Sequence, residues 1–381
     1  MRITLVISSL GAGGAERVMS VMAGYWAENG QDVSLITLAS PVSDFYALHP
    51  SVKRIGLGLL VTSSHRLVKA TLHNIQRLRQ LRREILASRP DVVLSFVDTT
   101  NILTLLASVR LGVPVIVAEH TDPRHHPVGA IWTRLRYLLY PRANAVVVLT
   151  QALRAWAEGF LPQGIVHVIP NPVPVELLAH GGPVERNGHA HTIVAMGHLT
   201  RLKGFDLLLN AFARCAVLHS NWSLIILGEG EERERLKQLA LELGVGERVR
   251  MPGRMPDPFE ILRGADLFVL SSRYEGFPMA LLEAMACRVA VICTQYPSGP
   301  EEIVQNEMNG LMVPTDDIEA LAAAMHRLML DPSERERLAS CAVDVREKFG
   351  LERVMTMWDL LITQACSSHR PVKRQREQAI A

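Results

Sequence analysis

Two glutamates bracket the start of a predicted helix in the second half of the chain. The stretch Arg273-Tyr274-Glu275-Gly276-Phe277-Pro278 follows an apolar strand, and a helix is expected to begin near Met279. The first amides of a helix have no partner inside it, so those of residues 279–281 suit a diphosphate. Glu283 could reach the ribose of a bound nucleotide, and Glu275 would lie near a sugar. This spacing favours a nucleotide-binding helix start over an ordinary solvated one.

A second polar turn, residues 197–204, follows the first strand of the second half. Its sequence, Gly-His-Leu-Thr-Arg-Leu-Lys-Gly, places His198, Arg201 and Lys203 at the carboxyl end of that strand. Lys203 could neutralise the charge that develops on a leaving diphosphate. Since a Lys-Gly pair before a helix is also common without a ligand, the turn is a weak signal by itself.

A glycine-rich turn, residues 11–17, follows the first predicted strand. Glycine lets the backbone approach a ligand closely, and the next helix offers its free amides to an anion. A dinucleotide site of the GxGxxG type would need a third glycine where the chain has Glu16. It would also need an acidic residue at the end of the second strand, but Asp32 stands at its start. The turn therefore favours contact with a phosphate or a sugar over NAD, with tight strand–helix packing as the structural alternative.

Short β-rich runs alternate with helical periodicity on both sides of residue 180, which is typical of βαβ units. The expected strands are residues 3–8, 32–38, 92–95, 114–118 and 145–149, then 192–196, 223–227, 249–251, 267–270 and 290–293. The expected helices are residues 14–28, 67–86, 101–109 and 152–160, then 205–218, 231–243, 280–287 and 318–330. The pattern predicts two doubly wound, Rossmann-like α/β domains with ligands at the carboxyl ends of the strands, facing a cleft.

The predicted boundaries follow from breaks in this pattern. Residues 1–170 form the first domain and residues 192–350 the second. The proline- and glycine-rich stretch 171–191 between them is expected to be a linker. A helix over 351–366 and a basic tail over 367–381 complete the chain.

Composition excludes several classes of protein. The chain has 381 residues, 48% hydrophobic and 20% charged, which excludes a disordered or collagen-like chain. The chain has five cysteines, an odd number, and no two of them form a CxxC motif. Neither a disulfide framework nor a zinc site is therefore expected. No apolar run reaches the length of a membrane-spanning helix.

A charge asymmetry points to an anionic surface. Residues 1–180 carry 17 Lys and Arg against 11 Asp and Glu, whereas the remainder carries 23 against 27. The predicted helix over 65–89 contains seven basic residues and Glu84 as its one acidic residue, and it has an apolar stripe. A basic amphipathic helix indicates binding to an anionic membrane surface, here through Arg66–Arg89. The alternative is a core helix with a solvated basic face. No recognition motif accompanies the charge, so no nucleic-acid partner is expected.

Together these motifs resemble the retaining GT-B glycosyltransferases of glycosyltransferase family four, over about residues 1–365. The matching stretches are Gly13–Arg17, Glu119-His120, Asn171-Pro172, Gly197 to Gly204, Gly228–Glu231, Gly253-Arg254, Glu275 and Glu283 in an E-x7-E spacing, Ser298–Ile303 and Asn309–Pro314. More loosely, residues 95–101 and 119–124 resemble bacterial enzymes that add N-acetylgalactosamine or related sugars to lipid-linked oligosaccharides. The resemblance implies a C-terminal helix that crosses back to the first domain.

The resemblance also implies a role for each matching residue. His120, Lys203 and Glu275 would act in catalysis, with His120 facing the reacting sugar, Lys203 on the diphosphate and Glu275 on the donor sugar. The donor-binding residues would be Gly13, Gly14, His198, Gly253, Arg254, Phe277, Pro278, Met279, Ala280, Leu281 and Glu283. The acceptor-binding residues would be Glu16, Arg17, Asp98 and Asn101. His198 departs from the family, which usually has Arg after this glycine. Either His198 is protonated beside the phosphates or Lys203 carries most of that role.

The family's chemistry needs no side-chain nucleophile. The leaving phosphate oxygen accepts the acceptor's proton on the same face of the sugar, so catalysis is positioning and electrostatic stabilisation. No Asp-x-Asp occurs, so neither a metal nor another cofactor is expected, although His120, His125 and His126 lie close in sequence. The expected partners are a UDP-sugar donor and a lipid-linked or polysaccharide acceptor, at the inner face of the cytoplasmic membrane. Two alternatives stay open: a GT-B nucleotide-sugar epimerase, and a non-catalytic member that binds a sugar or lipid.

Overall fold

The chain divides into two compact α/β units. The computed structural model describes residues 1–60, 67–125, 127–174, 177, 190–255, 257–297 and 299–369, and for residues 67–72 the backbone only. Unit 1 contains Met1–Asn171 together with the chain from Val354 onward, and unit 2 contains Pro172–Arg353. Most of the predicted linker 171–191, all but three residues of the predicted tail, and Arg66, His126 and Ser298 lie outside the described residues.

Unit 1 is built on a seven-stranded parallel sheet of order β3-β2-β1-β4-β5-β6-β7. The strands are β1 Arg2–Ile7, β2 Asp32–Thr37, β3 Lys53–Gly56, β4 Val92–Phe96, β5 Val115–Glu119, β6 Ala145–Val148 and β7 Val166–Val168. The helices are α1 Gly14–Glu28, α2 Leu67–Ser88, α3 Asp98–Ala107, α4 Ala130–Leu139 and α5 Gln151–Glu158, with short 3-10 turns η1 Pro41–Ser43 and η2 Tyr140–Arg142. The strand order reverses between β1 and β4, which is where a doubly wound sheet places its ligand.

Unit 2 repeats this plan with a six-stranded parallel sheet of order β10-β9-β8-β11-β12-β13. The strands are β8 His191–Met196, β9 Trp222–Leu227, β10 Val249–Gly253, β11 Leu267–Leu270, β12 Ala290–Gln295 and β13 Leu311–Pro314. The helices are α7 Phe205–Ala216, α8 Arg233–Glu242, α9 Phe259–Arg263, α10 Met279–Ala286, α11 Ile318–Leu330, α12 Pro332–Ala342 and α13 Val345–Lys348, with 3-10 turns η3 Arg201–Lys203, η4 Gly246–Arg248 and η5 Pro300–Glu302. Here the order reverses between β8 and β11. The predicted doubly wound architecture is therefore confirmed in both units.

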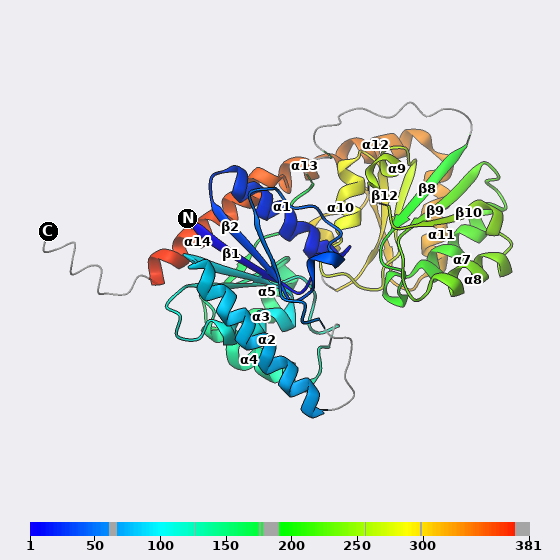
Figure 1. Cartoon of the computed structure of the whole chain (residues 1–381). Coiled ribbons are helices and arrows are strands. Elements are labelled where there is room, and N and C mark those ends of the chain that lie inside the picture. Colours follow the sequence, from blue (N-terminus) through cyan, green and yellow to red (C-terminus); the bar gives the residue numbers. More distant parts are fainter. Residues whose placement is uncertain are drawn as a thin grey trace, which may run out of the picture. The chain divides into compact units, whose positions relative to one another are not determined.

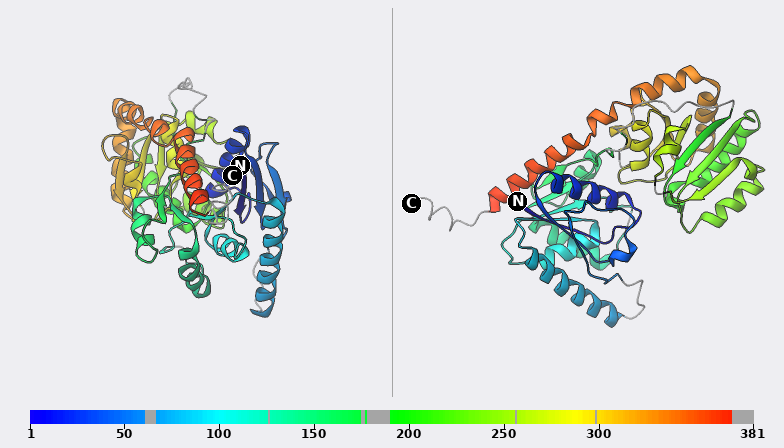
Figure 2. Two further views of the ribbon diagram at one scale, coloured as in Figure 1. Left: turned by 90° about the vertical axis from the view of Figure 1, so that its left-hand side faces the viewer. Right: turned by 45° about the horizontal axis from the view of Figure 1, so that its top comes forward.

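The last helix, α14 Leu351–His369, packs on the N-terminal unit, as predicted. Its Asp359 accepts a hydrogen bond from Trp26 Nε1 of α1 at 2.8 Å, and its Trp358 is buried against Phe96 of β4. Figures 1 and 2 show α14 beside α1 on one face of the unit 1 sheet, whereas α2, α3 and α4 lie on the other face. The helix continues through residues 367–369, so the predicted end at residue 366 is wrong by three residues.

The sequence missed several short elements. The predictions omitted strands β3, β7 and β13 and helices α4, α9, α12 and α13. Most of these are short, and a run of three to five residues shows too little periodicity to be recognised. α4 and α12 are longer. The N-cap of α4 is Gly129, which provides no side-chain capping bond, whereas α12 has Asp331 as a capping side chain and Pro332 in its first turn, signals that the sequence analysis overlooked.

Candidate active site

Glycines line the carboxyl ends of the central strands in unit 2. Gly228 has φ +138°, and a Cβ there would overlap the carbonyl oxygen of Gly197 at the end of β8. Gly204 has φ +63°, and a Cβ there would overlap the carbonyl oxygen of Ser271 after β11. No side chain fits at either position, so three backbone segments meet closely at the topological switch point.

Lys203 and Glu275 meet at this edge of the sheet. Lys203 Nζ donates to Glu275 Oε1 at 2.5 Å, and Ser272 Oγ donates to the same oxygen at 2.6 Å. The side chains are 25% and 10% exposed, so the pair is partly accessible to a ligand. The structure thus brings together two of the three residues predicted to be catalytic.

Arg273 holds the loop that carries Glu275 against the turn that carries Lys203. The sequence analysis did not assign this role. The Arg273 guanidinium forms two hydrogen bonds to the Asp206 carboxylate, at 2.8 and 2.9 Å, and one to Asp316 at 2.7 Å. The pairing with Asp206 also raises the pKa of Arg273. Its backbone amide donates to the carbonyl of Leu202, so the loop after β11 is tied to η3. A bidentate Arg–Asp pair is geometrically specific, and here it fixes Lys203 and Glu275 relative to one another.

The start of α10 offers fewer free amides than predicted. Pro278 is its N-cap and makes no side-chain capping bond. However, the Met279 amide donates to the carbonyl of Phe277, and the Leu281 amide donates to that of Pro278. The expectation that these two amides are free is therefore wrong. Only the Ala280 amide lacks a backbone partner within the described part of the first turn.

The other predicted donor residues differ in exposure. Glu283 is 2% exposed, and Phe277 is buried against Phe349, with 5.9 Å between ring centroids. Arg254 is exposed, and His198 lies 3.7 Å from Glu231 with both side chains largely in solvent. Gly253 has φ +96°, and a Cβ there would come within 2.8 Å of Glu229 Oε1. Their donor-binding roles stay predictions.

In unit 1 the glycine-rich turn lies at the carboxyl end of β1. Gly13 is the N-cap of α1, and a Cβ there would overlap the Glu16 carboxylate, which folds back over the helix start. Ser9 Oγ donates to Glu16 Oε1 at 3.3 Å, and burial raises the pKa of Glu16. In this conformation the Glu16 carboxylate occupies the space above Gly13, whereas Gly14 is exposed.

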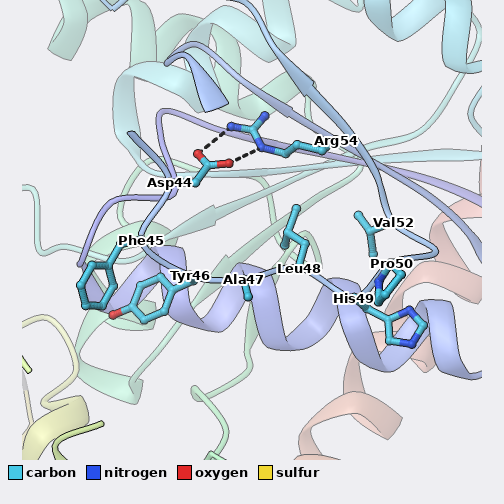
Figure 3. Close-up of a pocket in the computed structure, with 9 residues that line it drawn as sticks. All are labelled: Asp44, Phe45, Tyr46, Ala47, Leu48, His49, Pro50, Val52 and Arg54. Atoms are coloured by element: carbon cyan, nitrogen blue, oxygen red, sulfur yellow. Dashed lines mark hydrogen bonds and ion pairs between the residues drawn. The ribbon is translucent and has the colours of Figure 1, made fainter. Parts of the chain in front are cut away.

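A pocket of about 500 Å³ is shown in Figure 3. It lies near this turn, because the amide of Phe45, which lines the pocket, donates to the carbonyl of Leu10. It is lined by residues 44–50, Val52 and Arg54, and the Arg54 guanidinium forms two hydrogen bonds to the Asp44 carboxylate. Tyr46, one of its rings, lies under the Arg17 guanidinium, with 5.6 Å from Cζ to the ring centroid. The predicted acceptor residue Arg17 is therefore at the border of an open pocket that carries both aromatic and charged groups.

His120 follows β5 and lies on the ring of Phe96, with 4.2 Å between ring centroids. Both ring nitrogens are shielded from solvent and have no hydrogen-bond partner among the described residues. Burial lowers the pKa of His120 to about 3, so the ring is neutral at physiological pH. A neutral imidazole can donate from one nitrogen and accept at the other, but it brings no positive charge to a sugar.

Asn101 does not fit the acceptor-binding role predicted for it. It is fully buried, and its Nδ2 donates to the carbonyl oxygen of Ala118 at 2.9 Å and to Tyr140 OH at 3.1 Å. Asp98 is also buried, 5% exposed, and lies 3.9 Å from Arg136 Nη2. Both side chains thus lie beneath the surface of unit 1, and no sequence pattern at this helix start indicates that the polar pair is buried.

Among the described residues, no group of three or more His, Cys, Asp and Glu side chains could hold a metal ion. None of the described helices combines the length and hydropathy that crossing a membrane requires.

Two family models together match most of the chain. The model of glycosyltransferase family 4 matches residues 12–177, and that of group 1 glycosyl transferases matches residues 183–343. Two relatives come from Campylobacter jejuni, and both names describe α-1,4-N-acetylgalactosaminyltransferases that act on diphospho-undecaprenol-linked sugars. One is 28% identical over 96% of this chain and 99% of its own length. The other is 25% identical over 88% of this chain and 92% of its own length.

Solved structures share the whole fold. The sucrose-phosphate synthase of Thermosynechococcus elongatus superimposes with a TM-score of 0.83 at 19% identity, over 97% of this chain and 100% of that one. Anabaena Alr3699/HepE, solved in complex with UDP, gives a TM-score of 0.75 at 17% identity, over 96% and 100% of the two chains. At these identities the likeness establishes the GT-B fold alone.

Proposed function

Because the chain belongs to the group 1, family 4 glycosyltransferases, we propose that it transfers a hexose or N-acetylhexosamine from a UDP-sugar with retention of configuration. The observation that carries this proposal is the partly exposed Lys203–Glu275 pair at the glycine-lined switch point of unit 2. A cation and a carboxylate held 2.5 Å apart can separate to meet a phosphate and a sugar hydroxyl. The C-terminal unit is therefore the proposed donor site.

In the proposed reaction, the bond between C1 of the sugar and the diphosphate oxygen breaks as the acceptor oxygen attacks C1 from the same face. The leaving phosphate oxygen takes the proton of the acceptor hydroxyl, so no protein base and no metal are needed. Lys203 stabilises the charge on the leaving diphosphate, and Glu275 orients the sugar. His120 contributes a neutral hydrogen-bonding group from unit 1. His198 or Lys203 supplies the role that Arg usually has at this turn.

We further propose a lipid-linked oligosaccharide or a surface polysaccharide as the acceptor. The names of the two Campylobacter relatives support the lipid-linked class. The pocket beside Arg17 supports unit 1 as the acceptor side, because its aromatic rings suit a sugar face and its Asp44–Arg54 pair suits hydroxyls.

The same acceptor class supports action at the inner surface of the cytoplasmic membrane. On α2, Leu81 and Ile85 are buried, whereas Arg79 and Arg83 are exposed. Arg82, in contrast, donates to the carbonyls of Ala107 and Val109, so only part of the predicted basic face is available to lipid. Sedimentation with phosphatidylglycerol vesicles, but not with phosphatidylcholine vesicles, is expected. Its loss in R79E/R83E would assign the binding to α2.

Binding of nucleotide-sugars tests the proposed function directly. The full chain would be heated with UDP-, GDP- and ADP-sugars, each also compared with its free nucleotide. A ligand at about 100 times its dissociation constant adds about 2.7 kcal/mol of stability, which a raised midpoint reveals. A larger shift with one UDP-sugar than with UDP supports a donor site and names the donor. No shift with any nucleotide would contradict the proposal, and product analysis with donor alone would reveal an epimerase.

A further inference from the structure

A group of charged and polar side chains is buried beneath the end of β5, which we call the Glu119 network. It consists of Glu119, Asp98, Asn101, Arg136 and Tyr140, each at most 5% exposed. Arg136 Nε and Tyr140 OH both donate to Glu119 Oε1, the former at 3.0 Å. Arg136 Nη2 lies 3.9 Å from Asp98 Oδ2. The side chains come from β5, α3, α4 and η2, so the network joins four elements.

Stability alone does not account for this network. A buried ion pair pays a desolvation cost that its attraction often fails to recover, and a well-packed apolar group of similar volume is commonly as stable. The preceding residues of β5, Val115 to Ala118, are buried and apolar, as expected for a parallel strand. The charged residue comes only at the last position of the strand, directly before His120.

Glu119 and His120 point to opposite faces of the sheet. Successive side chains of a strand alternate, and Phe96 pairs with Ala118 in the register of β4 and β5. Phe96 and His120 therefore lie on the α14 face, where Trp358 packs on Phe96 at 5.9 Å between ring centroids. Glu119 lies on the α3 and α4 face. One residue pair thus anchors the strand end from both sides.

The backbone next to this point is strained. Val97, which follows β4, has φ +74°, a conformation that β-branched residues rarely adopt. Its amide donates to the carbonyl of Ala118, and Asn101 Nδ2 donates to the same carbonyl oxygen. Strain of this kind persists only where the surroundings hold it, and it concentrates at functional sites.

We propose that Arg136 and Tyr140 are positioning residues for His120. By holding Glu119 they fix the backbone at the end of β5, and this places the imidazole, which has no polar partner of its own in the part of the chain that the structure describes. The inference rests on the proposed function of His120 at the reacting sugar. Neither Arg136 nor Tyr140 touches the substrate in this scheme.

A double-mutant cycle tests this inference. Tyr140→Phe removes only the hydroxyl that donates to Glu119, and His120→Ala removes the group that is to be positioned. The assay measures UDP release from the UDP-sugar that gives the largest thermal shift, with water as the acceptor, in the wild type, both single variants and the double variant. Thr104→Val is the matched control, because Thr104 has a buried hydroxyl on α3 with no partner among the described residues.

Tyr140→Phe is expected to lower kcat about 10- to 100-fold with little change in the donor's KM, because a small misplacement of a catalytic group is costly. In the His120→Ala background the same substitution should have no further effect. An equal loss of kcat in both backgrounds would overturn the positioning role and leave the proposed function intact. If His120→Ala itself keeps wild-type kcat, the proposed role of His120 fails, and the positioning role fails with it.

Glu119→Gln provides a second variant if Tyr140→Phe does not fold. Glutamine keeps the shape and one carbonyl oxygen for Tyr140 but weakens the hold of Arg136. The same loss of kcat that disappears without His120 is expected. A Thr104→Val enzyme that loses as much kcat as Tyr140→Phe would show general loosening of unit 1 and would contradict the inference.

Discussion

The carboxyl ends of the two sheets hold their charged side chains in opposite ways, partly exposed in unit 2 and buried in unit 1. In unit 2, glycines bring backbone segments together and leave the Lys203–Glu275 pair partly open to solvent. In unit 1, the charged groups are sealed beneath the strand end, and Glu119, Arg136 and Tyr140 bond to one another. An open pair can exchange its partner for a ligand, whereas a sealed one acts on a ligand only through its neighbours. The contrast fits the proposal that unit 2 binds the charged diphosphate through Lys203 and that the buried groups of unit 1 position His120.

Removing Lys203 should produce the largest effect on catalysis. Lys203→Ala is expected to lower kcat by about 10² to 10³, the usual cost of losing one group that stabilises transition-state charge. Glu283→Ala should instead weaken nucleotide binding and raise KM. Steady-state kinetics on both variants separate the two effects. Lys237→Ala is the control, since Lys237 pairs with Glu234 on the exposed surface of α8. Unchanged kcat in Lys203→Ala would break the proposed division of labour.

Adding a side chain at Gly228 should destabilise unit 2 strongly. A Cβ at Gly228 would overlap the Gly197 carbonyl, and φ +138° is unfavourable for alanine. Gly228→Ala is expected to lower the free energy of unfolding by about 3 kcal/mol, as measured by urea denaturation. Gly264→Ala is the matched control, because its Cβ would make only ordinary contacts at 3.6 and 3.7 Å. Equal stability of the two variants would show that the close approach is not required.

More of the fold than of the site could be predicted from the sequence. The alternation of strands and helices has a local cause, so the order of the main elements and the helices over 14–28 and 318–330 came out as expected. The turn around Glu275 was also found, because glycine and proline mark it locally. The pairing of Lys203 with Glu275 spans 72 residues, however, and only the folded sheet brings these side chains together.

The Glu119 network of unit 1 was not predicted, because it too joins residues that are far apart in the sequence. Arg136 and Tyr140 lie on α4 and η2, and the helix that presents them was not predicted. Asn101 was assigned to the acceptor from the resemblance to the family alone, and that resemblance carries no information about its burial. Burial of a polar side chain depends on partners from distant parts of the chain, so neither periodicity nor composition reveals it.

The pH dependence of the free energy of unfolding can test whether the Glu119 carboxyl group is shielded from water. Burial raises the pKa of Glu119 from 4.5 to about 7, despite the opposing effect of Arg136. The folded state therefore holds this proton more tightly than the unfolded chain. The stability that results is complete below about pH 4.5 and is lost as the pH rises to about 7, by at most about 1.4 kcal/mol per unit. The titratable groups that face Glu119 are Arg136, Asp98 and the neutral phenol of Tyr140.

Glu119→Gln removes this contribution, so the free energy of unfolding of the variant should rise relative to that of the wild type as the pH increases from 5 to 7. Urea denaturation at half-unit steps provides the measurement. A variant that follows the wild-type curve would show that Glu119 is solvated and that the buried network is not sealed.

His120 should act in the opposite direction. Burial lowers the pKa of His120 from 6.5 to about 3, so the unfolded chain binds this proton more tightly than the folded protein. Its contribution to stability is complete above about pH 6.5 and is lost as the pH falls toward 3. Between about pH 4.5 and 6.5 the slopes due to Glu119 and His120 oppose each other, so the wild-type curve should be nearly flat there. His120→Asn should expose the falling slope of Glu119, and Glu119→Gln the rising slope of His120. Because the two residues are adjacent in sequence but lie on opposite faces of the sheet, the double variant should be flat again, unless the two groups titrate as one coupled site.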